Sequence, residues 1–279
     1  MTNPSSIGLG TILAGRYELV GELARGAMGD VFEALDRLSG SKAAVKVLRA
    51  EYLSDESMRR RFRREGAVLK ALDHPALVRL FELGIDDAGL VYLVTEYVEG
   101  QTLAERLMAG PVTIVEADAL VDALSGGLGA AHEHGVFHGD LKPGNVIWPA
   151  EGSPRLVDFG ASKILGLDRL TATGEVSGTP AYMAPEVLTG KTDVDQRIDV
   201  YGLGVLLYEA LSAKKPFEDR HLGRLMMKID AGDCLPIDAV ADLPKEIARV
   251  IERAMHRDKA ERFTEMADLR AAWHEARAK

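Results

Sequence analysis

One short segment of the chain, His138-Gly139-Asp140-Leu141-Lys142-Pro143-Gly144-Asn145, places a carboxylate, an amine and an amide close together. Proline and glycine disfavour a helix there, so we expect a constrained loop. Phosphoryl transfer needs a carboxylate to orient a hydroxyl, a cation near the transferred phosphate, and an oxygen ligand for magnesium. The spacing of Asp140, Lys142 and Asn145 therefore predicts a phosphoryl-transfer loop.

A lysine and a glutamate earlier in the chain form a second candidate pair. Lys46 interrupts the apolar strand Ala44–Leu48, where a buried amine is costly unless it is paired. A helix is predicted from Ser54 or Asp55 to about Leu72, and Glu65 falls on its apolar face. We expect Glu65 to pair with Lys46; the alternative is that Glu65 pairs with an arginine of its own helix.

Two further segments carry groups suited to phosphates and metals. Gly26 and Gly29 lie in a predicted hairpin, where glycine lets backbone N–H groups approach a phosphate; an ordinary glycine-containing hairpin is the alternative. A Rossmann fingerprint does not fit, because a strand and not a helix is predicted after Gly29. Asp158-Phe159-Gly160 follows a predicted strand and offers a second oxygen ligand.

Composition narrows the function class. The chain has 279 residues, 47% of them hydrophobic, a formal net charge of -9 and a single cysteine, Cys234. The negative charge argues against a nucleic-acid or anionic-membrane surface, and one cysteine excludes an internal disulfide. No signal peptide begins the chain, and the most apolar window, Val200–Leu211, is too short to span a bilayer. We expect a cytoplasmic location, for either a soluble protein or a piece of a longer one.

The periodicity changes near Gly100. Before it, strand patterns run from Arg16 to Leu48 and over Leu77–Leu83 and Leu90–Val98. After it, helical patterns dominate, with a long loop from Ala161 to Pro180. The predicted later elements are a helix over 115–131, strands over 146–148 and 155–157, and helices over 199–211, 222–230, 244–255 and 263–277.

Taken in order, these motifs and the segment Ala184-Pro185-Glu186 resemble the signature of the eukaryotic-type (Hanks-type) Ser/Thr protein kinases, in particular the bacterial ones. The resemblance covers about Arg16 to Arg277. It implies an α+β, protein-kinase-like bilobal fold with a small β-rich N-lobe and a larger, mainly helical C-lobe. The implied boundaries are an N-terminal extension over 1–15 and a kinase domain over 16–279, with the N-lobe at 16–98 and the C-lobe at 99–279.

The resemblance also implies the cofactors and the role of each site residue. ATP would be the phosphate donor, with Mg2+ as the metal and Mn2+ as its alternative. The implied catalytic residues are Asp140, Lys142, Lys46 and Glu65, and the metal ligands are Asn145 and Asp158. The implied nucleotide-binding residues are Leu23, Ala24, Gly26, Gly29, Val31, Ala44, Lys46, Thr95, Glu96, Val98, Asn145, Ile147 and Asp158. Glu186 would pair with Arg262, and Asp199 would brace the segment His138–Asn145, which is the catalytic loop of the family.

The sequence departs from the family pattern at two positions. Ala24 replaces the first glycine of the glycine-rich loop, which is tolerable if its φ stays negative. Gly139 replaces an arginine that in the family normally binds a phosphorylated residue of the activation loop, which here is the long loop from Ala161 to Pro180. We therefore expect activity that does not depend strongly on phosphorylation of that loop. The loop still offers Thr171, Thr173 and Ser177 as phosphorylation sites.

Three functions remain open on the sequence. A Ser/Thr protein kinase, with autophosphorylation, is favoured: Lys142 and Gly178-Thr179-Pro180 indicate Ser or Thr and not Tyr as the acceptor, and Phe159-Gly160 and Ala184-Pro185-Glu186 argue against a small-molecule kinase. His138-Gly139-Asp140 also resembles the aminoglycoside and choline phosphotransferases, which act on small molecules. A pseudokinase that acts as a binding module is the third reading. The expected partners are ATP and proteins with Ser or Thr acceptors, with no nucleic acid and no membrane segment in this chain; a homodimer is left open.

Overall fold

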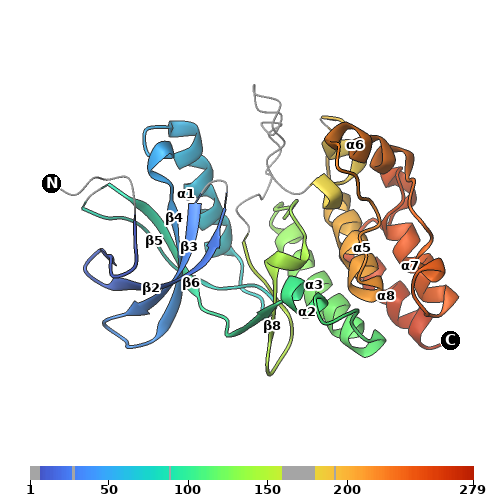
Figure 1. The fold of residues 1–279 in the computed structure, drawn as a ribbon, viewed down its shortest axis with the longest axis horizontal. Coiled ribbons are helices and arrows are strands. Elements are labelled where there is room, and N and C mark those ends of the chain that lie inside the picture. The colour runs from blue at the N-terminus through green and yellow to red at the C-terminus, as the bar shows by residue number, and fades with distance from the viewer. Residues whose placement is uncertain (1–6, 27–28, 88, 159–179, 192) are drawn as a thin grey trace. The chain divides into compact units, whose positions relative to one another are not determined.

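An antiparallel sheet dominates the first of two units, which consists of Met1–Asp73 and Val78–Val98. In the computed structural model (Figure 1), the described residues are 7–26, 29–87, 89–158, 180–191 and 193–279. The six strands follow the order β1-β2-β3-β4-β6-β5. Their bounds are β1 Ile12–Leu13, β2 Tyr17–Arg25, β3 Gly29–Asp36, β4 Lys42–Leu48, β5 Leu80–Ile85 and β6 Val91–Glu96.

The strands form where the sequence alternates apolar and polar residues. In β4, Ala43, Val45 and Val47 are buried, whereas Ala44 and Lys46 between them are only half-buried. Because successive strand residues point to opposite faces, one face of the sheet is packed and the other is more open. The packed face carries the core of this unit, which includes Leu13, Leu19, Phe32, Ala34, Val45, Val47 and Val94.

Helix α1 (Glu56–Ala71) lies against β5 in this unit. Asp55 caps the helix, because its carboxylate accepts hydrogen bonds from the backbone N–H of Ser57 (2.9 Å) and Met58 (3.1 Å). Phe62 is fully buried in a small cluster of apolar side chains with Leu93 of β6. The predicted helix is therefore confirmed, with its start and end within a residue or two of the expected positions.

The second unit, His74–Leu77 with Glu99–Lys279, is mainly helical. A short antiparallel sheet has the order β7-β8-β9, with β7 Gly100–Thr102, β8 Val146–Pro149 and β9 Arg155–Leu156. The helices are α2 Leu103–Leu107, α3 Ile114–Glu133, α4 Pro185–Leu188, α5 Arg197–Ser212, α6 Leu222–Ala231, α7 Lys245–Ala254 and α8 Met266–Arg277. The predicted division into a β-rich and a helical part is confirmed.

Helix α5 is the most buried element of the second unit and packs against α3 and α7. Gly204 permits the close approach of α7, because a Cβ there would lie 2.9 Å from Ala254 Cβ. Helix α8 is fixed to α3, where Asp118 accepts hydrogen bonds from Trp273 Nε1 (2.8 Å) and Arg277 Nε (2.9 Å). The helix that leads into the catalytic loop is thereby held from both sides.

One strand boundary differs from the prediction, and one strand is not predicted. The predicted strand Leu77–Leu83 begins later, because β5 starts at Leu80, and Leu77 belongs to the second unit, where it forms a bridge with Leu156 of the same unit. The carbonyl of Leu77 also accepts a hydrogen bond from Arg155 Nη2 (2.8 Å). The sequence patterns do not predict strand β1, which pairs with β2 and places Leu13 fully buried in the core of the sheet.

Candidate active site

Three predicted site residues form one hydrogen-bonded cluster in the loop between α3 and β8. Lys142 Nζ donates to Asp140 Oδ2 (2.9 Å). The side-chain amide of Asn145 donates to the Asp140 carbonyl (2.9 Å) and more weakly to Asp140 Oδ2 (3.4 Å). The loop thus holds a carboxylate, an amine and an amide in hydrogen-bonding contact, as the spacing predicts.

A buried carboxylate holds the backbone of this loop. Asp199 of α5 accepts hydrogen bonds from the backbone N–H of His138 (2.8 Å) and Gly139 (2.7 Å), and from His132 Nε2 (2.8 Å). Burial alone raises the pKa of Asp199, but the hydrogen bonds that it accepts and its electrostatic interactions with His132 and His138 outweigh burial and lower that pKa below its ordinary value. The predicted bracing role of Asp199 is confirmed.

The backbone at Gly139 explains why glycine suits this position. Its φ is +69°, in the left-handed region that glycine adopts without steric cost. A hydrogen bond from the N–H of Asp140 to Nδ1 of His138 (3.2 Å) closes the turn around Gly139. The left-handed conformation of Gly139 therefore helps to set the direction in which the Asp140 side chain leaves the backbone.

Asp158 has an uncommon backbone conformation and lies just after β9. Its φ is +62°, which costs energy for a residue with a Cβ and is found most often at functional sites. The preceding residue is tied to the catalytic loop, because Val157 N–H donates to the carbonyl of Asn145 (2.9 Å). The second unit thus holds Asp158 and Asn145 on hydrogen-bonded neighbouring segments. Phe159 and Gly160, as well as Thr171, Thr173, Ser177, Gly178 and Thr179, lie outside the described residues.

The first unit gathers other predicted nucleotide-binding residues on the more open face of its sheet. Val31 of β3 lies opposite Lys46 of β4, and Ala44 lies opposite Thr95 of β6. All four side chains are half-buried. The side chain of Glu65 is outside the described part of α1, so the expected pair of Glu65 with Lys46 stays a prediction.

The remaining predicted residues lie at strand ends and turns. Gly26 N–H donates to the carbonyl of Gly29 (3.0 Å), and a Cβ at Gly29 would lie 2.5 Å from the carbonyl oxygen of Val47, so this glycine is also required for strand packing. Ala24 of β2 lies opposite Val31 of β3. Its φ is not positive, which is the condition under which alanine can replace glycine at this position. Leu23 is exposed in β2, Glu96 ends β6, Val98 ends the first unit, and Ile147 is half-buried in β8.

A buried ion pair stabilises the region after the long loop. Arg262 donates from Nη1 and Nη2 to the two carboxylate oxygens of Glu186, at 2.7 and 2.8 Å. Both side chains are almost completely buried. The pair predicted between Glu186 and Arg262 is confirmed.

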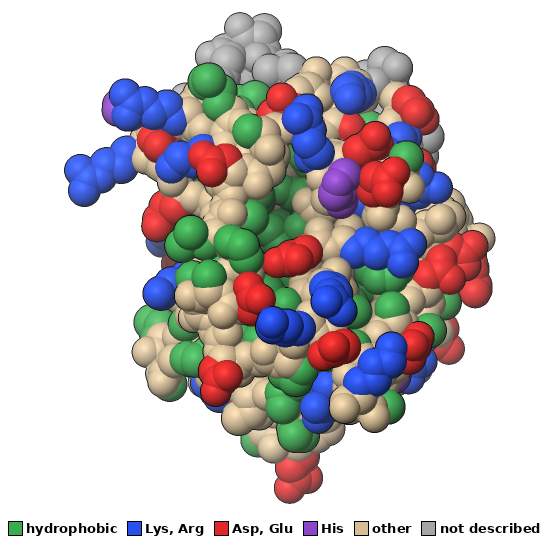
Figure 2. Space-filling view, turned by 90° about the vertical axis from the view of Figure 1, so that its right-hand side faces the viewer, with side chains coloured by type: hydrophobic (Ala, Val, Ile, Leu, Met, Phe, Trp, Pro, Cys, Tyr) green, Lys and Arg blue, Asp and Glu red, His purple; other side chains and the backbone are tan. Residues whose placement is uncertain are grey.

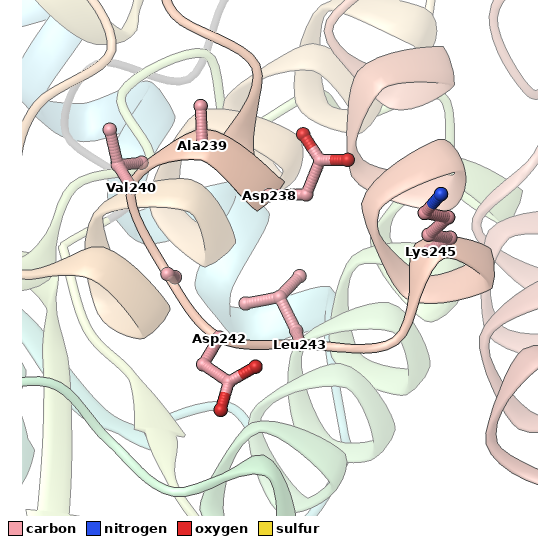
Figure 3. Close-up of a pocket in the computed structure, with 7 residues that line it drawn as sticks. Asp238, Ala239, Val240, Asp242, Leu243 and Lys245 are labelled. Atoms are coloured by element: carbon pink, nitrogen blue, oxygen red, sulfur yellow. The ribbon is translucent and has the colours of Figure 1, made fainter.

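Two hollows among the described residues lie in the second unit. One, of about 290 Å3, lies beside the catalytic loop and is lined by Leu107, Lys142, Pro143, Tyr182, Glu209 and Lys215, among others. The other, of about 450 Å3, lies within the loop that precedes α7 (Figure 3). Asp238, Asp242 and Lys245 surround the second hollow without any residue of the catalytic loop, so only the first is adjacent to the candidate chemistry.

The surface shown in Figure 2 carries acidic and basic side chains interspersed with one another. That face therefore does not present the one-sign positive patch that nucleic-acid binding requires. Among the described residues, no helix is both long enough and apolar enough to cross a membrane.

Comparison with known proteins agrees with this geometry. Residues 17–274 match the family model described as the protein kinase domain, so the chain belongs to the protein kinase domain family. The serine/threonine-protein kinase PrkC of Bacillus subtilis is 31% identical over 265 residues, which are 94% of this chain and 41% of PrkC. The serine/threonine-protein kinase PknA of Mycobacterium tuberculosis is 35% identical over 260 residues, 91% of this chain and 60% of PknA.

The fold is that of a protein kinase. The crystal structure of the M. tuberculosis PknI kinase domain matches with a TM-score of 0.78 and 27% identity, covering 98% of this chain and 100% of that one. The predicted α+β kinase-like class is thereby confirmed. The chain spans less than two thirds of the length of PrkC and of PknA. A family model of protein kinases favours the protein-kinase reading over the small-molecule phosphotransferases.

Sequence reasoning missed several residues near the site. His132 is a single histidine on α3, and neither its spacing nor its neighbours indicate that it reaches Asp199. Tyr182 and Glu209 share a hydrogen bond although they are distant in sequence. Contacts of this kind depend on how the helices pack and leave no periodic signal in the sequence.

Proposed function

We propose that this chain is an ATP-dependent protein kinase that transfers the γ-phosphate of ATP to Ser and Thr hydroxyls of proteins, including its own. The observation that carries the proposal is the cluster of Asp140, Lys142 and Asn145 on a loop anchored by buried Asp199. Asp140 would orient the acceptor hydroxyl and accept its proton. Lys142 would neutralise the charge on the transferred phosphate, so that catalysis rests on positioning and electrostatics.

The residues present fit a magnesium nucleotide. Asn145 commits its amide nitrogen to two oxygens of Asp140, so its carbonyl oxygen is the atom suited to a metal. With the carboxylate of Asp158, this gives two hard oxygen donors, as Mg2+ or Mn2+ prefers. Among the described residues there is no cluster of three or more His, Cys, Asp or Glu side chains placed to hold a metal. A site completed by nucleotide phosphates and water, as magnesium sites usually are, is consistent with that donor set.

The first unit would supply the nucleotide's other contacts. Lys46 would bind the α- and β-phosphates with Glu65 as its partner, and Gly26 and Gly29 would cover the phosphates. The half-buried apolar face at Val31 and Ala44, which lies beside Thr95, suits a flat aromatic base, to which Leu23 and Ile147 would add. Backbone groups of Glu96 and Val98 would hydrogen-bond the adenine. The proposal also includes an N-lobe over residues 16–98, a C-lobe over residues 99–279 and a cytoplasmic location.

The test compares the wild-type chain with Asp140→Asn. Purified protein is incubated with labelled ATP and magnesium, alone, with casein or myelin basic protein, and with a panel of aminoglycosides. We expect transfer to protein and a loss of about a hundredfold or more in Asp140→Asn, the usual contribution of a positioned general base.

The matched control is Asp238→Asn, which removes an exposed carboxylate from the other hollow and should leave turnover unchanged. Mass spectrometry then maps any self-phosphorylated residues. Transfer to aminoglycosides alone would support the small-molecule reading. No turnover in the wild-type chain, and therefore none to lose in Asp140→Asn, would instead identify a pseudokinase that acts as a binding module.

A further inference from the structure

Strand β5 forms an edge of the sheet in the first unit. Among the described residues it has a strand neighbour on one side only, because the order of the sheet ends with β6-β5. The other edge is β1, which has two residues, whereas β5 has six. An unpaired edge of this length presents backbone N–H and C=O groups with which another chain can pair. The residues of β5 include neither proline nor lysine, which commonly protect such an edge.

Three apolar side chains alternate along β5 and are exposed. The exposed fractions of Phe81, Leu83 and Ile85 are 54%, 38% and 52%. Leu83 lies opposite Leu93 of β6, and Leu93 packs with Phe62 of α1, so this face of β5 is the one towards α1. Ile85, two residues after Leu83, shares that face. A strand added beside β5 would therefore bury more of this apolar strip.

Helix α1 places two cations beside the strip. A Cβ at Gly66 would lie 3.1 Å from a methyl carbon of Leu83, so Gly66 is on the side of α1 that faces β5. Helix residues three or four positions apart share a face, which places Arg63 and Lys70 on the same side of the helix as Gly66. Both side chains are exposed, and neither has an ion-pair partner among the described residues.

Three nearby acidic side chains are already paired with other groups. Glu82 of β5 accepts hydrogen bonds from two tyrosine hydroxyls (2.8 and 2.7 Å), and as the neighbour of Leu83 it points to the opposite face. Glu56, at the start of α1, lies 3.7 Å from Arg59. Asp73, just after α1, lies 3.6 Å from Arg79. The strip and its two cations thus form an apolar and positive surface on a chain whose formal net charge is -9.

We propose that this β5 edge surface, formed by Phe81, Leu83, Ile85, Arg63 and Lys70, binds an extended segment of a partner protein that adds a strand beside β5. Backbone hydrogen bonds provide affinity in this mode of recognition, and alternate side chains provide specificity. On the face towards α1, the segment carries an apolar side chain flanked by Asp or Glu, which complements the strip and the two cations. A second copy of this chain is a poorer occupant, because pairing two β5 edges would bring the cations of both copies together.

The experiment measures the binding of fluorescent peptides to the whole chain by fluorescence anisotropy. One peptide repeats Glu-Thr-Ile-Thr, so that Glu and Ile fall on one face of a strand, and the other has Lys in place of each Glu. We expect the Kd of the Glu peptide to be lower by about fivefold, the ratio for two exposed ion pairs, and the ratio to shrink at high salt. A fully N-methylated Glu peptide, which cannot donate hydrogen bonds to the β5 backbone, should not bind.

Variants of the chain locate the binding surface. Arg63→Glu should bring the ratio of the two Kd values close to one, and Arg63→Glu combined with Lys70→Glu should invert it. Ile85→Thr, which keeps a β-branched residue in the strand, should weaken the binding of both peptides. The matched control is Arg249→Glu, the same charge change at an exposed residue of α7, which should keep the wild-type ratio.

Several results would overturn this inference. They are no binding of either peptide by wild type, an unchanged ratio in Arg63→Glu, an equal change in Arg249→Glu, and undiminished binding of the N-methylated peptide. Light scattering adds a further test, because a wild-type dimer that Ile85→Thr dissociates would show that a second copy occupies the edge. Binding is measured without ATP, so none of these outcomes depends on the proposed kinase activity.

Discussion

Removing the carboxylate of Glu186 should destabilise the second unit by about 3–5 kcal/mol, the cost of leaving a buried charge without its partner. The Arg262 side chain is 0% exposed, and both of its terminal nitrogens bind Glu186. Its other donors reach backbone carbonyls of His256 (2.6 Å), Arg197 (3.2 Å) and Arg257 (3.1 Å). In Glu186→Ala those carbonyls remain, but no anion balances the guanidinium.

The chain carries a convenient probe for this experiment. Both of its tryptophans, Trp148 and Trp273, belong to the second unit, so intrinsic fluorescence reports the unfolding of that unit in urea. We would measure the free energy of unfolding for Glu186→Ala, Arg262→Met and the double variant. The double variant should be less destabilised than the sum of the single ones, because it leaves no buried charge.

An exposed ion pair in the same unit provides the control. Glu246 and Arg249 approach to 3.9 Å with side chains that are 40% and 73% exposed, so Glu246→Ala should change the unfolding free energy by less than about 0.5 kcal/mol. If Glu186→Ala cost less than about 1 kcal/mol, or if the double variant were strictly additive, the buried pair would not be the anchor that its geometry indicates.

The other predictions concern the catalytic loop and the long loop that follows it. Gly139→Ala should lower the free energy of unfolding by about 1 kcal/mol, because the φ of Gly139 is +69°. Urea unfolding of this variant is compared with that of Gly144→Ala, because Gly144 does not have a positive φ. Asp199 has a lowered pKa when folded, so its contribution to stability is present above its unfolded pKa of about 4 and is lost as the pH falls through the folded value. Asp199→Asn should therefore be less stable at neutral pH but should lose less stability as the pH falls below about 4; parallel pH profiles would contradict this. Alanine at the three loop positions Thr171, Thr173 and Ser177 together should leave turnover within about a hundredfold of wild type, roughly 2.7 kcal/mol; a larger loss would show that Gly139 does not free the enzyme from loop phosphorylation.

Much of the fold follows from local sequence patterns. The helix after Asp55 has a cap and an apolar stripe, and the structure places it at Glu56–Ala71. The catalytic loop was predictable because Asp140, Lys142 and Asn145 are close in sequence, so backbone geometry alone brings them together. The pairing of Glu186 with Arg262 was found by resemblance, since nothing local connects these two residues.

The misplaced strand shows what local patterns do not contain. Leu77 has a side chain typical of a strand, but its backbone pairs with Leu156, far along the chain. The short strand β1 was missed for a similar reason, since two residues give no alternation to detect, and Leu13 is recognised as core only once it is paired with Tyr17. Long-range pairing decided the outcome at Leu77, whereas the pairing of Leu13 with Tyr17 is local but too short to leave a pattern in the sequence.

The left-handed backbone of Asp158 has a consequence for engineering this chain. Glycine adopts a φ of +62° freely, so Asp158→Gly would relieve local strain while it deletes the proposed magnesium ligand. Selection for heat resistance alone therefore does not protect the proposed ligand at this position. A screen for robust variants needs a catalytic readout from its first round.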